Sequence, residues 1–116
     1  MNYITLSVFA ARTTDVTISV GQNVTLVCNS SLAKPVNWWY KSQLDGEEIE
    51  VVINGVVANG NVDRMTLHQY NLIIHNVTTS DSGVYTCVEN TGFGEHHKIS
   101  LTVSGFIVCF SLFIVC

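Results

Sequence analysis

The residues in this sequence best suited to chemistry are its cysteines, which stand at positions 28, 87, 109 and 116. Four cysteines allow three pairings. Cys28 and Cys87 each lie in a run where apolar and polar residues alternate, whereas the other two lie in the apolar last eleven residues. A bridge between Cys28 and Cys87 would close a loop of about 60 residues. By lowering the entropy of the unfolded chain, it would stabilise the fold by roughly 4 kcal/mol. We predict this bridge, because either alternative joins the interior of the domain to the apolar tail.

No other set of side chains predicts catalysis or a metal site. His96 and His97 are adjacent, so on a strand they would point to opposite faces and could not bind one ion together. The cysteines lack the spacing of zinc ligands. There is no Gly-Xaa-Ser-Xaa-Gly motif and no phosphate-binding loop. We therefore expect neither an enzyme nor a protein that holds a metal or a cofactor.

The composition narrows the class of protein further. The chain has 116 residues, of which 47% are apolar, enough to exclude a disordered tail and to fill one domain. Lys and Arg number 5 against 9 Asp and Glu, without a basic stripe, so we expect no nucleic-acid partner. Charged residues make up 12%, about half the typical share, so another group must hydrate the surface.

Three Asn-Xaa-Ser/Thr sequons could supply that hydration as N-linked glycans. They begin at Asn23, Asn29 and Asn76. In the alternating run that contains Leu26 and Cys28, the apolar residues face inward, so Asn23 and Asn29 should face outward. Chance occurrence in an Asn-rich chain is the alternative interpretation.

The elements that would hold these residues are short strands, because apolar and polar residues alternate with a period of two along most of the chain. No window shows a sustained helical period. Asn54-Gly55, between two apolar runs, is a strong hairpin signal. Nine short strands predict a β-sandwich or a β-barrel. They cover residues 16–20, 24–28, 36–41, 50–53, 56–58, 65–67, 70–74, 84–88 and 98–103.

The two ends of the chain differ from its middle. Residues 1–11 resemble the end of a signal peptide, with small residues at Val8 and Ala10 before a cut, although an N-terminal strand is the alternative. Residues 105–116 are almost all apolar, but the last eleven as a helix would reach only about 16 Å, against roughly 30 Å for a bilayer core. We interpret this tail as a truncated transmembrane segment. Packing onto the domain and a lipid-anchor signal are the alternatives.

Three motifs together resemble the immunoglobulin superfamily, and most closely its variable, or V-set, type. They are Val24-Thr-Leu-Val-Cys28, Trp38-Trp-Tyr-Lys41 and Asp81-Ser-Gly-Val-Tyr-Thr-Cys87. The resemblance implies an all-β, two-sheet Greek-key sandwich over residues 14–104. The hairpin at Asn54-Gly55 fits the strands C′ and C″ of the variable type.

The resemblance also implies roles for single residues. Tyr85 takes the tyrosine-corner position, and Arg64 should form an ion pair with Asp81. Phe93-Gly94 resembles the joining segment of antigen receptors, but His96 stands where that segment usually has a second glycine. We therefore do not predict an antibody or T-cell-receptor domain.

The identity of the core tryptophan is ambiguous in the sequence. Alternation with Val36 favours Trp38, whereas the motif match and a separation of eleven residues from Cys28 favour Trp39. We choose Trp39 and expect Trp38 to face outward. A slip of one residue would turn every side chain of this strand to the other face. The other expected core residues are Leu26, Leu72 and Tyr85.

The sequons also suggest where a partner binds. All three fall in the sheet that the family's lettering would build from strands A, B, E and D. The opposite sheet, of strands G, F, C, C′ and C″, has none, so it is the expected recognition face. Aromatic residues on such a face are typical interface anchors. The residues predicted to contact the partner are Trp38, Tyr40, Glu47, Glu48, Phe93 and Glu95.

We therefore expect a cell-surface recognition module of the adhesion or immune-receptor kind. Its partner would be a protein, either another immunoglobulin-like domain or a second copy of the chain. It would lie on the extracellular side of the plasma membrane as a single-pass protein, with secretion as the second choice. The alternative functions are a soluble or virus-encoded decoy of such a receptor and a carbohydrate-binding V-type module.

Overall fold

The computed structural model describes residues 12–28, 35–43, 46–89 and 97–105, and these ranges contain nine strands. Two single-turn 3-10 helices, η1 (Asn59–Asn61) and η2 (Thr79–Asp81), interrupt them. The strands are β1 (Arg12–Ser19), β2 (Val24–Leu26), β3 (Val36–Ser42), β4 (Glu48–Ile53), β5 (Val56–Val57), β6 (Met65–His68), β7 (Asn71–Ile74), β8 (Gly83–Glu89) and β9 (His97–Ser104).

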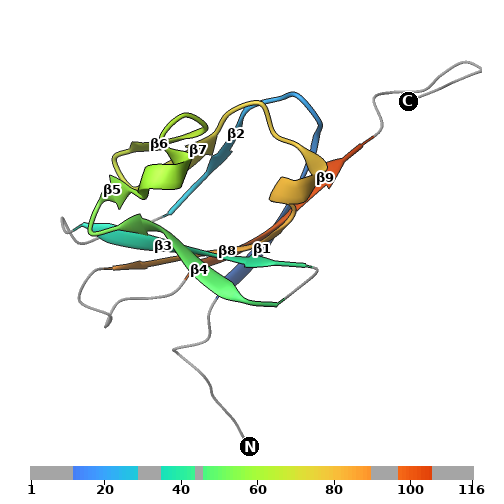
Figure 1. Cartoon of the computed structure of the whole chain (residues 1–116). Helices are drawn as coiled ribbons and strands as arrows, with labels where there is room; N and C mark the ends of the chain where they lie inside the picture. The colour runs from blue at the N-terminus through green and yellow to red at the C-terminus, as the bar shows by residue number, and fades with distance from the viewer. Residues whose placement is uncertain (1–11, 29–34, 44–45, 90–96, 106–116) are drawn as a thin grey trace, which may run out of the picture.

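The strands form two sheets that face each other (Figure 1). The larger sheet has six strands in the order β1-β9-β8-β3-β4-β5, and the smaller has three in the order β2-β7-β6. The expected all-β, two-sheet sandwich of the variable immunoglobulin type is confirmed. The assignment of the first strand to the smaller sheet is wrong, because β1 pairs in parallel with β9 along its whole length. Alternation shows which face of a strand is buried, but not which sheet the strand joins.

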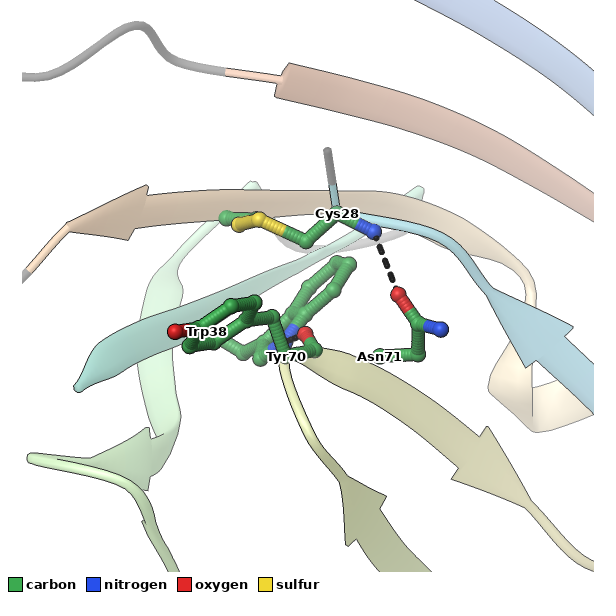
Figure 2. Close-up of a disulfide and its surroundings, with 5 residues drawn as sticks. Cys28, Trp38, Tyr70 and Asn71 are labelled. Carbon is green, nitrogen blue, oxygen red and sulfur yellow. Dashed lines mark hydrogen bonds between the residues drawn. A yellow bond between two sulfur atoms is a disulfide. The ribbon is translucent and has the colours of Figure 1, made fainter. Parts of the chain in front are cut away.

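A disulfide between Cys28 and Cys87 joins the two sheets, as predicted, with 6.0 Å between the Cα atoms. The Cys28 backbone N–H donates to Oδ1 of Asn71 at 3.0 Å. Figure 2 shows Trp38 next to the disulfide. Its side chain is fully buried, and its indole N–H donates to the Tyr70 carbonyl at 3.0 Å.

The core tryptophan is therefore Trp38, and the choice of Trp39 is wrong. Trp39 is half-buried and lies on the other face of β3. The strand keeps its alternation because the irregularity lies in its neighbour: β4 passes from Val52, opposite Trp38, to Glu50, opposite Trp39. Leu26, Leu72 and Tyr85 are buried as expected.

The hairpin between β4 and β5 turns at Asn54-Gly55, as the sequence predicts. Both residues have positive φ, 53° and 82°, which suits the tight turn that joins Ile53 to Val56. The turn is also tied to β3. The Gly55 N–H donates to the Val36 carbonyl at 3.0 Å, and the Asn54 N–H donates to Oδ1 of Asn37 at 2.6 Å.

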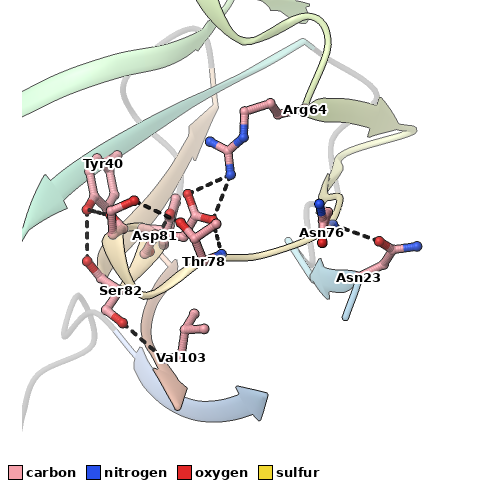
Figure 3. A network of polar contacts seen from close by, with 10 residues as sticks. Asn23, Tyr40, Arg64, Asn76, Thr78, Asp81, Ser82 and Val103 are labelled. Carbon is pink, nitrogen blue, oxygen red and sulfur yellow. Dashed lines mark hydrogen bonds and ion pairs between the residues drawn. The ribbon is translucent and has the colours of Figure 1, made fainter. Parts of the chain in front are cut away.

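A polar network at the turn before β8 holds the opposite end of the sandwich (Figure 3). Nη2 of Arg64 contacts both carboxylate oxygens of Asp81, at 2.8 and 2.7 Å, so the ion pair that the resemblance implies is present. The Thr78 N–H donates to the same carboxylate. Asp81 is buried, and a buried charge is stable only when it is paired and hydrogen-bonded in this way.

Tyr85 fastens this turn to the core. Its hydroxyl donates to the Asp81 carbonyl oxygen at 2.6 Å, the four-residue reach of a tyrosine corner. Burial raises the pKa of the Tyr85 phenol far above its usual range. The nearby Asp81 and Tyr40 raise this pKa further, and Arg64 lowers it by a smaller amount.

Candidate recognition surface

The surface that could meet a partner is the outer face of the six-stranded sheet, the face that points away from the three-stranded sheet. Residues paired across neighbouring strands project from the same face, so the register shows which side chains lie together. One row crosses the middle of the sheet, and we call it the central row. It contains Thr13 of β1, Lys98 of β9, Thr86 of β8, Trp39 of β3 and Glu50 of β4.

Trp39 occupies the centre of this row. Its neighbour Thr86 is 5% exposed, although it points away from the core of the sandwich. Trp39 and Lys98 are the larger residues paired with Thr86 on its two sides. The centre of the outer face is thus an aromatic ring beside a shielded hydroxyl, while Lys98 itself is exposed.

Two apolar side chains lie on the same outer face, further along β4 from the central row, at the tip of the β4–β5 hairpin. Ile53 and Val56 are paired in register, so both project from the outer face. They are 49% and 67% exposed. The backbone hydrogen bonds that Asn54 and Gly55 donate to β3 hold the hairpin tip that carries these two side chains. Ile53 and Val56 thus form a small exposed apolar strip at the edge of the sheet.

The other end of β4 is acidic. Glu47 and Glu48 are exposed, and Glu50 is half-buried. Lys41 is paired in register with Glu48 and is the basic residue closest to this group along the sheet. Residues paired in register form a second row across the sheet, next to the central row. It runs from Asp15 through Ser100, Val84 and Lys41 to Glu48.

Two of the six residues predicted to contact a partner are placed elsewhere. Trp38 is wrong because it is fully buried. Tyr40 is wrong for the outer face because it follows the inward alternation of β3: its ring lies 4.7 Å from that of Tyr85, centroid to centroid. Its hydroxyl donates to the carbonyl oxygens of Ser80 and Ser82. Glu47 and Glu48 are accessible, and Phe93 and Glu95 lie outside the described residues.

The sequence interpretation missed the apolar and basic residues of this face. Trp39 was assigned to the core, and Ile53, Val56 and Lys98 were not singled out. Two signals in the sequence could have found them. Strict alternation from Val36 places Trp39 outward, and the two-residue turn at Asn54-Gly55 pairs Ile53 with Val56.

The sequon asparagines Asn23 and Asn76 lie close together at the start of β2 and the end of β7. The Asn76 backbone N–H donates to Oδ1 of Asn23 at 2.9 Å (Figure 3). Both side chains are exposed, at one end of the three-stranded sheet. Asn29 lies outside the described residues.

Residues of β1 and β9, and residues in and just after β2, line a pocket of about 230 Å³. Its lining holds no carboxylate and no thiol. In the ranges that the structure describes, no three His, Cys, Asp or Glu residues gather as a metal site. No helix within those ranges could cross a bilayer. The pocket is lined by Thr14, Val16, Thr25, Leu26, Val27, His97, Lys98 and Ile99.

Two curated proteins are similar to this chain in sequence. Hemicentin-1 of Homo sapiens is 35% identical over 88 residues, which are 73% of this chain and 1% of that protein. Hemicentin-1 of Mus musculus is 34% identical over 88 residues, with the same coverage. The chain thus spans about a hundredth of the length of these relatives.

Two solved structures agree on the fold. The N-terminal four Ig domains of Dscam1 isoform 7.44 match with a TM-score of 0.63 and 26% identity, over 81% of this chain and 23% of that one. Drosophila Semaphorin 2a matches with a TM-score of 0.62 and 18% identity, over 84% of this chain and 15% of that one. The family model of the immunoglobulin V-set domain matches residues 12–104. Together with the sheet order, the disulfide and the buried Trp38, this match shows that the chain belongs to the immunoglobulin V-set family.

Proposed function

We propose that this chain is an extracellular recognition module that binds a protein partner through the outer face of its six-stranded sheet. The observation that carries the proposal is the central Trp39, half-buried between the shielded Thr86 and the acidic β4. A few residues, most often tryptophan, tyrosine or arginine near the centre of the contact, dominate the energy of protein interfaces. The apolar pair Ile53 and Val56 extends the same contact area.

The position of the sequons supports the choice of face. Glycans on Asn23 and Asn76 would project from one end of the three-stranded sheet, on the opposite layer of the sandwich. A bulky, hydrated glycan blocks close contact between proteins where it is attached. It would leave the outer face of the six-stranded sheet accessible.

The disulfide supports an extracellular location, because such bonds persist in oxidising compartments and are rare in the cytosol. We propose that residues 105–116 begin a single-pass membrane anchor and that residues 1–11 are the end of a signal peptide, which leaves a domain over residues 14–104. Binding, rather than catalysis, is the proposed activity. Carbohydrate binding is the less favoured alternative, because we would expect it to use an exposed arginine on β8. The outward residues of β8 between Val84 and Val88 include no arginine.

The test is to present the full chain to a panel of cell-surface ectodomains and measure which of them it binds. Trp39→Arg and Ile53→Arg should each abolish binding, because they place a charge in the contact. Val27→Arg is the matched control: Val27 is 53% exposed and Ile53 is 49% exposed, but Val27 follows β2 on the other sheet. The proposal is refuted if Val27→Arg abolishes binding and the two outer-face variants keep it, provided circular dichroism shows all three folded.

A further inference from the structure

We propose that the partner of the outer face is a second copy of this chain, packed face to face with its strands parallel to those of the first. The inference rests on the proposed function, since it uses the same face. The central row carries it. Lys98 stands on β9 and Glu50 on β4, and the two strands between them hold Thr86 and Trp39. The row is basic at one end, acidic at the other and aromatic in between.

A two-fold axis that runs along the strands, between β8 and β3, makes this row complementary to itself. Such an axis keeps the position along the strand and reverses the order of the strands. It therefore sets Lys98 of each copy opposite Glu50 of the other, which gives two ion pairs for one contact. Trp39 of each copy then lies over Thr86 of the other and beside the second Trp39. Sheets that pack with nearly parallel strands, tilted by about 30°, are a common arrangement.

The second row agrees with this axis. It would place Ser100 of one copy, whose hydroxyl can donate a hydrogen bond, opposite the Glu48 carboxylate of the other. A two-fold axis across the strands, through the central row, would instead set Lys98 against Lys98 and Glu50 against Glu50. Like charges opposed in this way are destabilising. The charges thus select the parallel arrangement.

The contact would be small. Four strands spaced about 4.8 Å apart and seven residues long cover roughly 20 Å by 23 Å. Over both copies this is about 900 Å², below the roughly 1,200 Å² at which stable complexes begin and within the range of weak, transient ones. We therefore expect reversible dimers that become prominent only when many copies share one surface. Because the ion pairs lie at the rim, the dimer should also weaken as salt is added.

Charge reversal tests the proposal in the full chain by sedimentation equilibrium. Glu50→Lys and Lys98→Glu should each weaken self-association about a hundredfold, because each variant opposes like charges at two places in the dimer. An equimolar mixture of the two variants should associate again, since every facing pair then has opposite charges. Asp15→Lys is the matched control for Glu50→Lys: it makes the same change in net charge on β1, beyond the four strands in contact. Association through the apolar residues 106–116 would ignore all of these changes.

The outcomes separate this inference from the proposed function. A wild-type chain that stays monomeric at millimolar concentration overturns the inference, and so does a mixture that fails to associate. If a monomeric wild-type chain binds a cell-surface partner and Trp39→Arg abolishes that binding, the proposed function stands. Only the identity of the partner is then wrong. If binding of every kind ignores Trp39→Arg, the proposed function fails as well.

Discussion

The two adjacent tryptophans should differ sharply in what they contribute to stability. Trp38 is fully buried beside the disulfide, and its indole N–H is bonded to the Tyr70 carbonyl. Trp38→Ala would remove on the order of 200 Å² of buried apolar surface, about 5 kcal/mol at 25 cal/mol per Å². Measured losses for such truncations are about 3–5 kcal/mol. Trp39 lies half-buried on the outer face, so Trp39→Ala should cost only about 1 kcal/mol.

Urea unfolding followed by far-ultraviolet circular dichroism measures both variants with one signal, which comes mainly from the backbone. If Trp38→Ala fails to fold, Trp38→Phe keeps most of the ring and should still lower the free energy of unfolding more than Trp39→Phe. A larger loss at Trp39 than at Trp38 would refute the register of β3. The outer face would then be assigned to the wrong residues.

Three further perturbations test the rest of the fold. Gly83→Ala should destabilise by about 1–3 kcal/mol in urea unfolding, because the added Cβ would overlap the Lys41 carbonyl oxygen. The raised pKa of Tyr85 gives stability that is complete below about pH 10 and is lost as the pH rises further, so Tyr85→Phe should flatten this alkaline loss. Asn23→Gln and Thr25→Ala should each remove one glycan, which mass spectrometry detects. Only Asn23→Gln should also lower the free energy of unfolding, by about 1 kcal/mol, because it removes the acceptor of the Asn76 backbone N–H.

Local patterns in the sequence predict most of this fold. The alternating runs match the strands. Asn54-Gly55 marks the hairpin because the turn needs positive φ at both positions, which these two residues adopt. The pairing of Cys28 with Cys87 could be predicted because both lie in alternating runs, whereas Cys109 and Cys116 lie in the apolar tail. The parallel pairing of β1 with β9 could not be predicted, because it joins segments at opposite ends of the chain.

The candidate site was harder to predict for the same reason. Alternation from Val36 indicates Trp38 as the inward residue, whereas the motif match and the spacing from Cys28 indicate Trp39, and only the register of β3 with its neighbours decides between them. Tyr40 was placed outward by the same one-residue error. The complementarity of Lys98 and Glu50 becomes visible only when the order β9-β8-β3-β4 is known, since 48 positions separate them in the sequence.

The most direct test of the outer face as the recognition surface is hydroxyl-radical footprinting of the full chain, free and bound to cells that capture it. Oxidation of Trp39 and Ile53 should fall several-fold on binding, because a partner would cover both side chains. Oxidation of Val27, about as exposed as Ile53, should stay the same. Protection of Val27, with Trp39 and Ile53 oxidised as in the free chain, would contradict the account.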